Sequence, residues 1–187
     1  KNQLSLAKYL FICAKEDNPD LDIHDVNAFM QHILQRIDLT RDLHFQTKTT
    51  IDTLDYSGTD LNSGSKVAFT VAGEVKRTLA TEIPSDLNLP DIFTDVKMVM
   101  PGVLAVKAPK YTFSQDTEIQ IALLNENLKA RDLSSLPLMI LCDDAEFTAA
   151  TSNNFVWVTF TRSNPSHDIY GINSFIEHKH WGCHGPL

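Results

Sequence analysis

The sequence predicts an α/β fold in which a layered sheet with helices is built from two related strand-helix-strand units. Short apolar runs at residues 9–14 and 138–141 each lead through acidic residues into a longer apolar segment, the alternation expected of packed strands and helices. Four identities also recur at one interval of 126 residues (153 − 27 = 126 and 168 − 42 = 126). They pair Asn27 with Asn153, Phe29 with Phe155, Arg36 with Arg162, and Asp42 with Asp168. A constant interval indicates an internal duplication, and a chance alignment is the alternative.

The duplication divides the single domain, residues 1–187, into three parts. Repeat one covers about 9–80, a connector about 81–135, and repeat two about 136–187. A chain of 187 residues is long enough to bury a substantial core.

Repeat one begins with a buried strand at residues 9–14. Asp22 or Asp25 caps the following helix, in which apolar residues recur at helical spacing as far as Ile37. A strand at 43–47, a loop rich in Gly, Asp, Asn and Ser at 49–65, and an alternating strand at 66–72 complete the repeat.

The connector and repeat two are predicted by weaker patterns. The connector is irregular at 74–91, then forms a short helix at 91–98, a strand at 103–107 and an amphipathic helix at 116–130. Residues 155–160 of repeat two are β-branched and aromatic, which favours a strand. Their counterparts in repeat one are helical in pattern, and packing often overrides propensity. We therefore expect a helix at 152–161.

The composition argues against several classes of protein. A net charge of −8 argues against a nucleic-acid partner or an anionic membrane, because both require a basic face. No apolar run approaches the length of a transmembrane helix, and no signal peptide is visible. Cys13, Cys142 and Cys183 form no even framework, so we expect free thiols in a reducing cytoplasm.

Both ends of the sequence look cut. The chain begins without Met and stops after Gly185-Pro186-Leu187, where a strand is starting. We expect it to be a piece of a longer polypeptide.

Four potential zinc ligands, His178, His180, Cys183 and His184, lie within seven residues. Their spacing lacks the two separated pairs of a structural zinc site. We therefore predict a polar turn near Trp181 and no bound metal, with a zinc site as the alternative.

Acidic side chains follow the strand predicted at 138–141. Asp143, Asp144 and Glu146 occupy the position where α/β sheets bind ligands. Paired carboxylates there hold a cation or act as acid and base. The favoured interpretation is helix capping in a solvated loop.

The paired Arg and Asp residues of the two repeats predict local ion pairs that fix the turn after each helix. These pairs are Arg36 with Asp42 and Arg162 with Asp168, and a substrate carboxylate bound by either Arg is the alternative. The Ser-Gly-Ser-Lys sequence at 63–66 lacks the full spacing of a phosphate loop and predicts a turn. No nucleophilic triad follows from spacing alone, so we assign no catalytic residue.

Further motifs match a known family. In repeat one they are Phe11-Ile12-Cys13, the helix at 25–36 with its Asn27, Arg41-Asp42, Ile51-Asp52, Leu54-Asp55-Tyr56 and Gly64-Ser65-Lys66. In repeat two they are Cys142-Asp143-Asp144, Asn154-Phe155, Trp157, Thr161-Arg162, Pro165 and Asp168. With these motifs the chain resembles the C-terminal domain of the UbiD-type decarboxylases, the carboxy-lyases named for 4-hydroxy-3-polyprenylbenzoate decarboxylase. It departs from the family pattern at Ala14-Lys15, where acidic residues are preferred.

The resemblance implies a decarboxylation, or its reverse, on an aromatic or unsaturated carboxylic acid. It further implies prenylated FMN and a divalent metal in the full-length enzyme, bound by an upstream domain of the same polypeptide. We therefore place no catalytic, flavin-binding or metal-binding residue here, and expect the fragment alone to hold no cofactor and to be inactive.

In the family this domain supplies subunit association, which implies a homo-oligomer, and one wall of the active-site cleft. The segment after the first Arg-Asp pair approaches that cleft in relatives. The resemblance therefore makes Thr50 and Ile51 the substrate-pocket candidates, and the duplication adds Phe175 and Ile176.

Two function classes follow. The first is the assembly and active-site-wall domain of a prenylated-FMN-dependent (de)carboxylase. The alternative is a non-catalytic α/β oligomerisation or binding module of the same ancestry. A flavin-binding domain encoded before Lys1 would favour the first.

Overall fold

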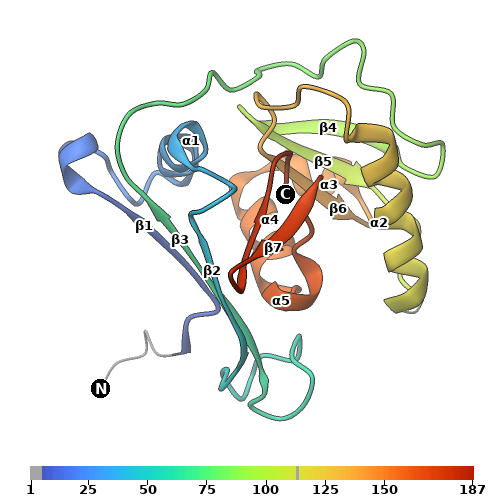
Figure 1. Cartoon of the computed structure of the whole chain (residues 1–187), viewed down its shortest axis with the longest axis horizontal. Coiled ribbons are helices and arrows are strands. Elements are labelled where there is room, and N and C mark those ends of the chain that lie inside the picture. Colours follow the sequence, from blue (N-terminus) through green and yellow to red (C-terminus); the bar gives the residue numbers. More distant parts are fainter. Residues whose placement is uncertain (1–5, 113) are drawn as a thin grey trace.

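The structure is a computed structural model that describes residues 6–112 and 114–187. Within these residues two three-stranded sheets stand apart, and a layer of helices and a small hairpin fill the space between them (Figure 1). The predicted α/β class is therefore confirmed in its coarse form.

The first sheet belongs to repeat one and has the strand order β1-β3-β2. It consists of β1 (Tyr9–Cys13), β2 (Leu43–Thr49) and β3 (Gly64–Val71), with β3 parallel to β1 and antiparallel to β2. A short 3-10 helix, η2 (Lys15–Asp17), follows β1. The helix α1 (Val26–Arg36) begins at Asp25, whose carboxylate accepts the Ala28 amide at 3.0 Å. These elements agree with the sequence prediction because period and capping signals coincide there.

The second sheet has the order β4-β5-β6. β4 (Thr94–Met100) is antiparallel to β5 (Val103–Lys107), and β6 (Leu138–Cys142) is parallel to β5. The crossover from β5 to β6 contains the helix α2 (Ser114–Leu128). The helix predicted at 91–98 is wrong, since β4 occupies those positions. Pro101-Gly102 turns a hairpin there, with Gly102 at a φ of +80°, and does not close a helix.

A helical layer follows β6. It comprises α3 (Ala145–Ala150), α4 (Ser152–Val156), the π-helical turn η3 (Trp157–Thr161) and α5 (Pro165–Asp168). The helix predicted at 152–161 is therefore present, despite its β-favouring composition. Phe155 is fully buried in this layer, which shows tertiary packing overriding local propensity.

The C-terminal hairpin consists of β7 (Ser174–Glu177) and β8 (His180–Cys183). His178 and Lys179 both have positive φ, as a two-residue turn of this kind requires. The hairpin docks on repeat one: the Cys183 amide donates to the Leu39 carbonyl at 3.0 Å. The Trp181 ring also meets Phe45 edge-on, with 5.3 Å between centroids.

The two helical regions begin with the same hydrogen bond. Asp25 accepts the amide of Ala28 at 3.0 Å, and Thr151 accepts the amide of Asn154 at 3.1 Å. The donors are separated by the interval found in the sequence (154 − 28 = 126). The N-terminal caps of the two repeats are therefore equivalent.

The turns after the two helices also match. Asp42 accepts the Asp38 amide at 2.8 Å, and Asp168 accepts the Asn164 amide at 2.5 Å. The strands that follow are placed differently, because β2 pairs in the sheet of β1 while β7 pairs with β8. The duplication of strand-helix-strand units is therefore not confirmed.

One apolar cluster joins the two sheets into a common core. It brings Met30 and Leu34 of α1 against Val103 and Ala105 of β5, with Phe155 packed beside them. Burial of this surface, at roughly 25 cal/mol per Å² of apolar area, holds the halves together.

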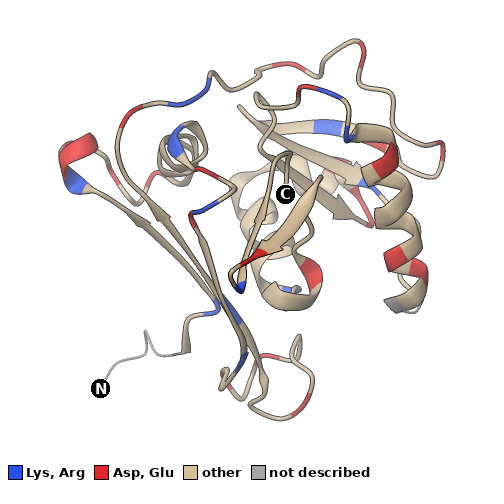
Figure 2. Ribbon diagram, in the orientation of Figure 1, with Lys and Arg blue, Asp and Glu red and all other residues tan. Residues whose placement is uncertain are grey.

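The charged residues of the described part of the chain form no dominant basic face in the view of Figure 2. Figure 2 shows Lys and Arg scattered among more numerous Asp and Glu in the described residues. No helix within residues 6–112 and 114–187 has the length and apolarity needed to cross a membrane.

Candidate functional site

A cavity of about 750 Å³ lies between the first sheet, β6 and the segment that follows η3. Its walls are largely apolar and come from Phe11, Phe69, Met30, Ile33, Leu34 and residues 138–142. One end is polar and is lined by Tyr9, Ser163, Asn164, His167 and Asp168. A concave apolar space with a few polar groups is the usual form of a ligand site.

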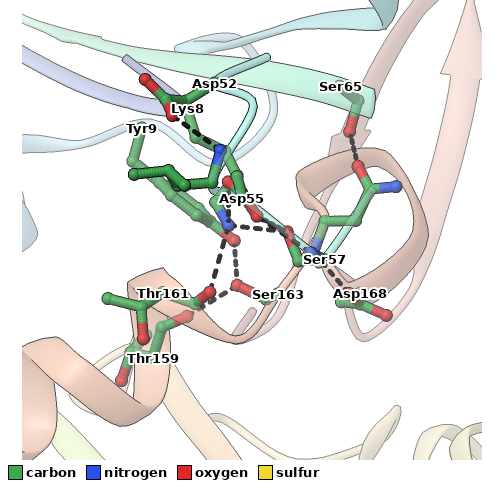
Figure 3. Close-up of polar contacts among 12 residues, drawn as sticks. Lys8, Tyr9, Asp52, Asp55, Ser57, Ser65, Thr159, Thr161, Ser163 and Asp168 are labelled. Atoms are coloured by element: carbon green, nitrogen blue, oxygen red, sulfur yellow. Dashed lines mark hydrogen bonds and ion pairs between the residues drawn. The ribbon is translucent and has the colours of Figure 1, made fainter. Parts of the chain in front are cut away.

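An ion pair between Lys8 and Asp55 lies beside Tyr9 and Ser163, the residues at the polar end of the cavity (Figure 3). Lys8 Nζ lies 2.9 Å from Asp55 Oδ2, and the two side chains are only 9% and 17% exposed. Lys8 also donates to Ser57 Oγ at 2.8 Å. Although burial opposes ionisation, hydrogen bonds from Ser57 and Lys8 lower the pKa of Asp55. The pair fastens the loop after β2 to the start of β1.

Tyr9 links β1 to the end of η3. Its hydroxyl lies 2.5 Å from Ser163 Oγ, and Ser163 Oγ in turn donates to the Thr159 carbonyl at 2.6 Å. Because the single hydroxyl proton of Ser163 is used on Thr159, Tyr9 is the donor in this pair. Burial raises the pKa of Tyr9 to about 12, so the phenol is neutral at pH 7.

A second polar contact ties β3 to the helical layer. The buried Ser65 hydroxyl donates to the Asn164 side-chain oxygen and accepts the Ser166 amide at 2.8 Å. Asp168 accepts the Asn164 amide, as Figure 3 shows. Ser65 is therefore engaged within the protein. The turn predicted at 63–66 is wrong for residues 64–66, because β3 begins at Gly64 and its ladder takes up this backbone.

These contacts define what the polar end does chemically. Lys8, Tyr9 and Ser163 each use a proton on a protein acceptor, and the Asp55 carboxylate is held by three donors, which are Lys8 Nζ, the Ser57 hydroxyl and the Ser57 amide. Such groups fix the relative position of β1, the loop at 50–63 and η3. This arrangement of Lys8, Tyr9, Ser163 and Asp55 therefore provides neither a general base nor a nucleophile that is directed into the cavity.

The predicted substrate-pocket residues are not brought together. Thr50 is exposed just after β2, whereas Ile51 is 2% exposed and packs beneath Gly58 and Gly64. Phe175 stacks on His184 with 5.1 Å between ring centroids, and Ile176 is 75% exposed. Their role as substrate contacts stays a prediction.

The four potential zinc ligands point to different surroundings. His178 is 92% exposed in the hairpin turn, and His180 Nε2 lies 3.2 Å from the Thr40 carbonyl. Cys183 is buried and donates to the Gly185 carbonyl, while His184 stacks on Phe175. In the part of the chain that the structure describes, no three His, Cys, Asp or Glu side chains are placed to hold an ion.

The acidic residues after β6 include a helix cap, as the favoured interpretation predicts. Asp144 accepts the Phe147 amide at 2.8 Å and begins α3. Asp143 and Glu146 are exposed beside it.

The predicted ion pairs between Arg and Asp are wrong. Arg36 donates to the carbonyls of Gly73 and His32, and Asp42 pairs with Arg41 at 2.8 Å. In repeat two the Arg162 guanidinium lies 4.5 Å from the centre of the Trp157 ring. Each Asp holds a backbone amide instead, because that amide lies four residues back in the same turn.

One family model matches the N-terminal part of the chain. Residues 1–71 match the family described as the 3-octaprenyl-4-hydroxybenzoate carboxy-lyase C-terminal domain. The resemblance found in the sequence is thereby confirmed for residues 1–71.

Longer relatives occur in Chlamydia. The chain is 30% identical over its whole length to a protein of Chlamydia pneumoniae whose name describes it as a subunit of 4-hydroxybenzoate decarboxylase. It is 34% identical over 95% of its length to an uncharacterised protein of Chlamydia caviae, and 30% identical over 96% to one of Chlamydia trachomatis serovar D. The chain spans 28% of the length of each of these relatives.

Sequence reasoning missed the residues at the polar end of the cavity. Lys8 and Tyr9 are separated from Thr161 and Ser163 by more than 150 positions. Only the Asp55-x-Ser57 spacing gave a local signal, because an Asp commonly accepts the amide two residues later.

Proposed function

We propose that this chain is the assembly and active-site-wall domain of a prenylated-FMN-dependent (de)carboxylase acting on an aromatic or unsaturated carboxylic acid. The observation that carries the proposal is the family match of residues 1–71, joined to a relative that is named as a decarboxylase subunit and aligns along the whole chain. In this proposal the domain works in the cytoplasm, in keeping with its three free cysteines.

The Gly64-Ser65 segment, the best sequence candidate for a phosphate loop, does not fit the phosphate of a flavin. A phosphate needs a cradle of free backbone amides, basic groups or a metal. The best sequence candidate is closed: a Cβ at Gly64 would meet Ile51 Cδ1 at 2.8 Å, and Ser65 is bonded on both sides. We therefore assign prenylated FMN and its divalent metal to the upstream domain of the longer polypeptide.

An exposed apolar loop supports the role in assembly. Leu54, Tyr56 and Leu61 are 78%, 88% and 73% exposed, and all three belong to the loop at 50–63. Lys8 and Asp55 hold that loop against β1. Exposed apolar side chains on a fixed loop are typical of a surface covered by another domain or subunit.

The test of the proposal uses the full-length parent enzyme. Changing Leu54, Tyr56 and Leu61 together to Ser should reduce both the oligomer size, measured by light scattering, and carbon dioxide release from 4-hydroxybenzoate or an acrylic acid. The matched control is Ile23→Ser, which changes an apolar residue that is 63% exposed elsewhere. Full assembly and turnover in the triple variant would refute the role of this loop.

A second measurement separates the wall role from a catalytic one. The isolated chain, mixed with prenylated FMN and the same acids, should retain no flavin and release no carbon dioxide. Retained flavin with turnover would place the active site in this domain. A parent that carries a flavin domain but never turns over would favour the non-catalytic binding module.

A further inference from the structure

The last residues of the chain begin a strand beside β6. The Leu187 amide donates to the Pro137 carbonyl at 3.0 Å, and the Met139 amide donates to the Leu187 carbonyl at 2.8 Å. Leu187 thus bonds to the residues on either side of Leu138, which is the hydrogen-bond pattern of two parallel strands. The C-terminus accordingly lies between the two sheets in Figure 1.

The same residues have an antiparallel neighbour on their other side. The Ile172 amide donates to the Pro186 carbonyl at 3.0 Å, and the Gly185 amide donates to the Ile172 carbonyl at 2.9 Å. Residues 185–187 thus lie between β6 and the segment before β7. β3 occupies the corresponding place in repeat one, parallel to β1 and antiparallel to β2.

The outer edge of β6 continues beyond this contact. The Leu138 amide bonds to Gly102 and the Cys142 carbonyl accepts the Ala108 amide, so residues 138, 140 and 142 face β5. By the alternation of a strand, Met139 and Leu141 direct their backbone groups away from β5. Within the described residues, Leu187 bonds to the Met139 amide. Leu141 is the next residue whose N–H and C=O groups point outward from the open edge of β6.

The cavity between the first sheet and β6 runs along this edge. All residues of β6 line it, as do residues 167–172 on the opposite side, Leu187 at one end and α1 across the middle. A space flanked by the open edge of β6, by the non-helical residues 169–172 and by apolar side chains has the form of a missing strand position, since strands lie about 4.8 Å apart when paired.

We propose that a strand continuing from Leu187 in a longer polypeptide fills this cavity, parallel to β6 and antiparallel to residues 170–172. The hydrogen bonds of Leu187 set its direction and register. The curated relatives are several times longer than this chain, which spans 28% of each. Because this strand would be buried on both faces, its amino-acid sequence should be mainly apolar. It should be about as long as β6, which has five residues.

Amide hydrogen exchange tests the proposal directly. The 187-residue chain is compared with the same chain lengthened by the parent polypeptide's next residues, about eight of them, enough for a typical strand. Exchange of the Leu141 amide should slow by about tenfold or more in the longer chain. The Phe11 amide, on the outer edge of β1, should not change, and the Val106 amide of β5 should be protected in both.

Two further hydrogen-exchange measurements serve as controls for the proposal. Leu187→Pro in the longer chain removes the amide that donates to Pro137, and should return Leu141 to fast exchange while Val106 stays protected. Unchanged Leu141 exchange on lengthening would overturn the proposal. Protection of Leu141 that appears in the 187-residue chain and rises with protein concentration would also overturn it, because a second copy would then occupy the edge.

Discussion

The ion pair between Lys8 and Asp55 should couple the folding of the loop at 50–63 to β1. With Nζ and Oδ2 2.9 Å apart, the Coulomb attraction is about 6 kcal/mol at an effective dielectric constant of about 20, before desolvation is subtracted. Removing one partner costs up to about 1 kcal/mol in an exposed pair and about 3–5 kcal/mol in a buried one. The side chains are 9% and 17% exposed. We therefore expect Asp55→Asn to lower the free energy of unfolding by about 2 kcal/mol, between these limits.

The assay is a double-mutant cycle of Asp55→Asn and Lys8→Met, followed by urea unfolding and by thermal melting. Each single variant should melt about 4–8 °C lower, given about 2–4 °C per kcal/mol for a chain of this size. The exposed Asp20→Asn serves as the control. Because the pKa of Asp55 is lowered from its ordinary 3.8, its stabilisation is present above that pH and is lost as the pH falls through the folded value. A coupling energy near zero, or an unchanged acid transition in Asp55→Asn, would refute this reasoning.

Three other predictions concern single side chains. Phe155→Ala should lower the free energy of unfolding in urea by about 3–5 kcal/mol, because the ring is fully buried; a loss below about 1 kcal/mol would contradict its place in the core. A thiol reagent should modify the half-buried Cys13 before the other two cysteines, because burial raises the pKa of Cys142 and raises that of Cys183 to about 12; mass spectrometry that finds another order of modification would count against this. In an absorbance titration, Tyr9→Phe should remove a phenol that ionises near pH 12. The folded pKa of Tyr9 lies above its ordinary 10.0, so its stabilisation is complete below pH 10 and is lost as the pH rises toward 12; an identical titration in the variant would contradict this.

Much of the secondary structure was predictable where two signals agreed. The helix α1 has both a capping Asp25 and an apolar face at helical spacing, and β5 is a short apolar run after a Pro-Gly turn. The helix through Phe155 was predictable only from the duplication, since its composition favours a strand. The strand β4 was missed because Pro101-Gly102 was interpreted as the end of a helix, although a Pro-Gly pair between two apolar runs also indicates a hairpin.

The candidate site was much less predictable, for a physical reason. Its long-range polar contacts join residues from 49 positions apart, in Lys8 with Ser57, to 154 positions apart, in Tyr9 with Ser163. A local pattern carries no information on such pairs, because they depend on how two sheets pack. The predicted pairing of Arg36 with Asp42 failed for the opposite reason: a backbone amide in the same turn lies closer to the carboxylate than the guanidinium does.

The docking of the C-terminal hairpin on repeat one has a consequence for synthesis. The Cys183 amide bonds to the Leu39 carbonyl across 144 positions (183 − 39 = 144), and Trp181 covers Phe45 of β2. At about 5–20 residues per second, a ribosome delivers Cys183 about 7–30 s after Leu39. During that interval the nascent first sheet presents the Phe45 side of β2 uncovered, and uncovered strands of this kind associate with other chains. The order of translation thus makes the hairpin a late cover for β2, and a chaperone that holds β2 would have to release it only when the hairpin arrives.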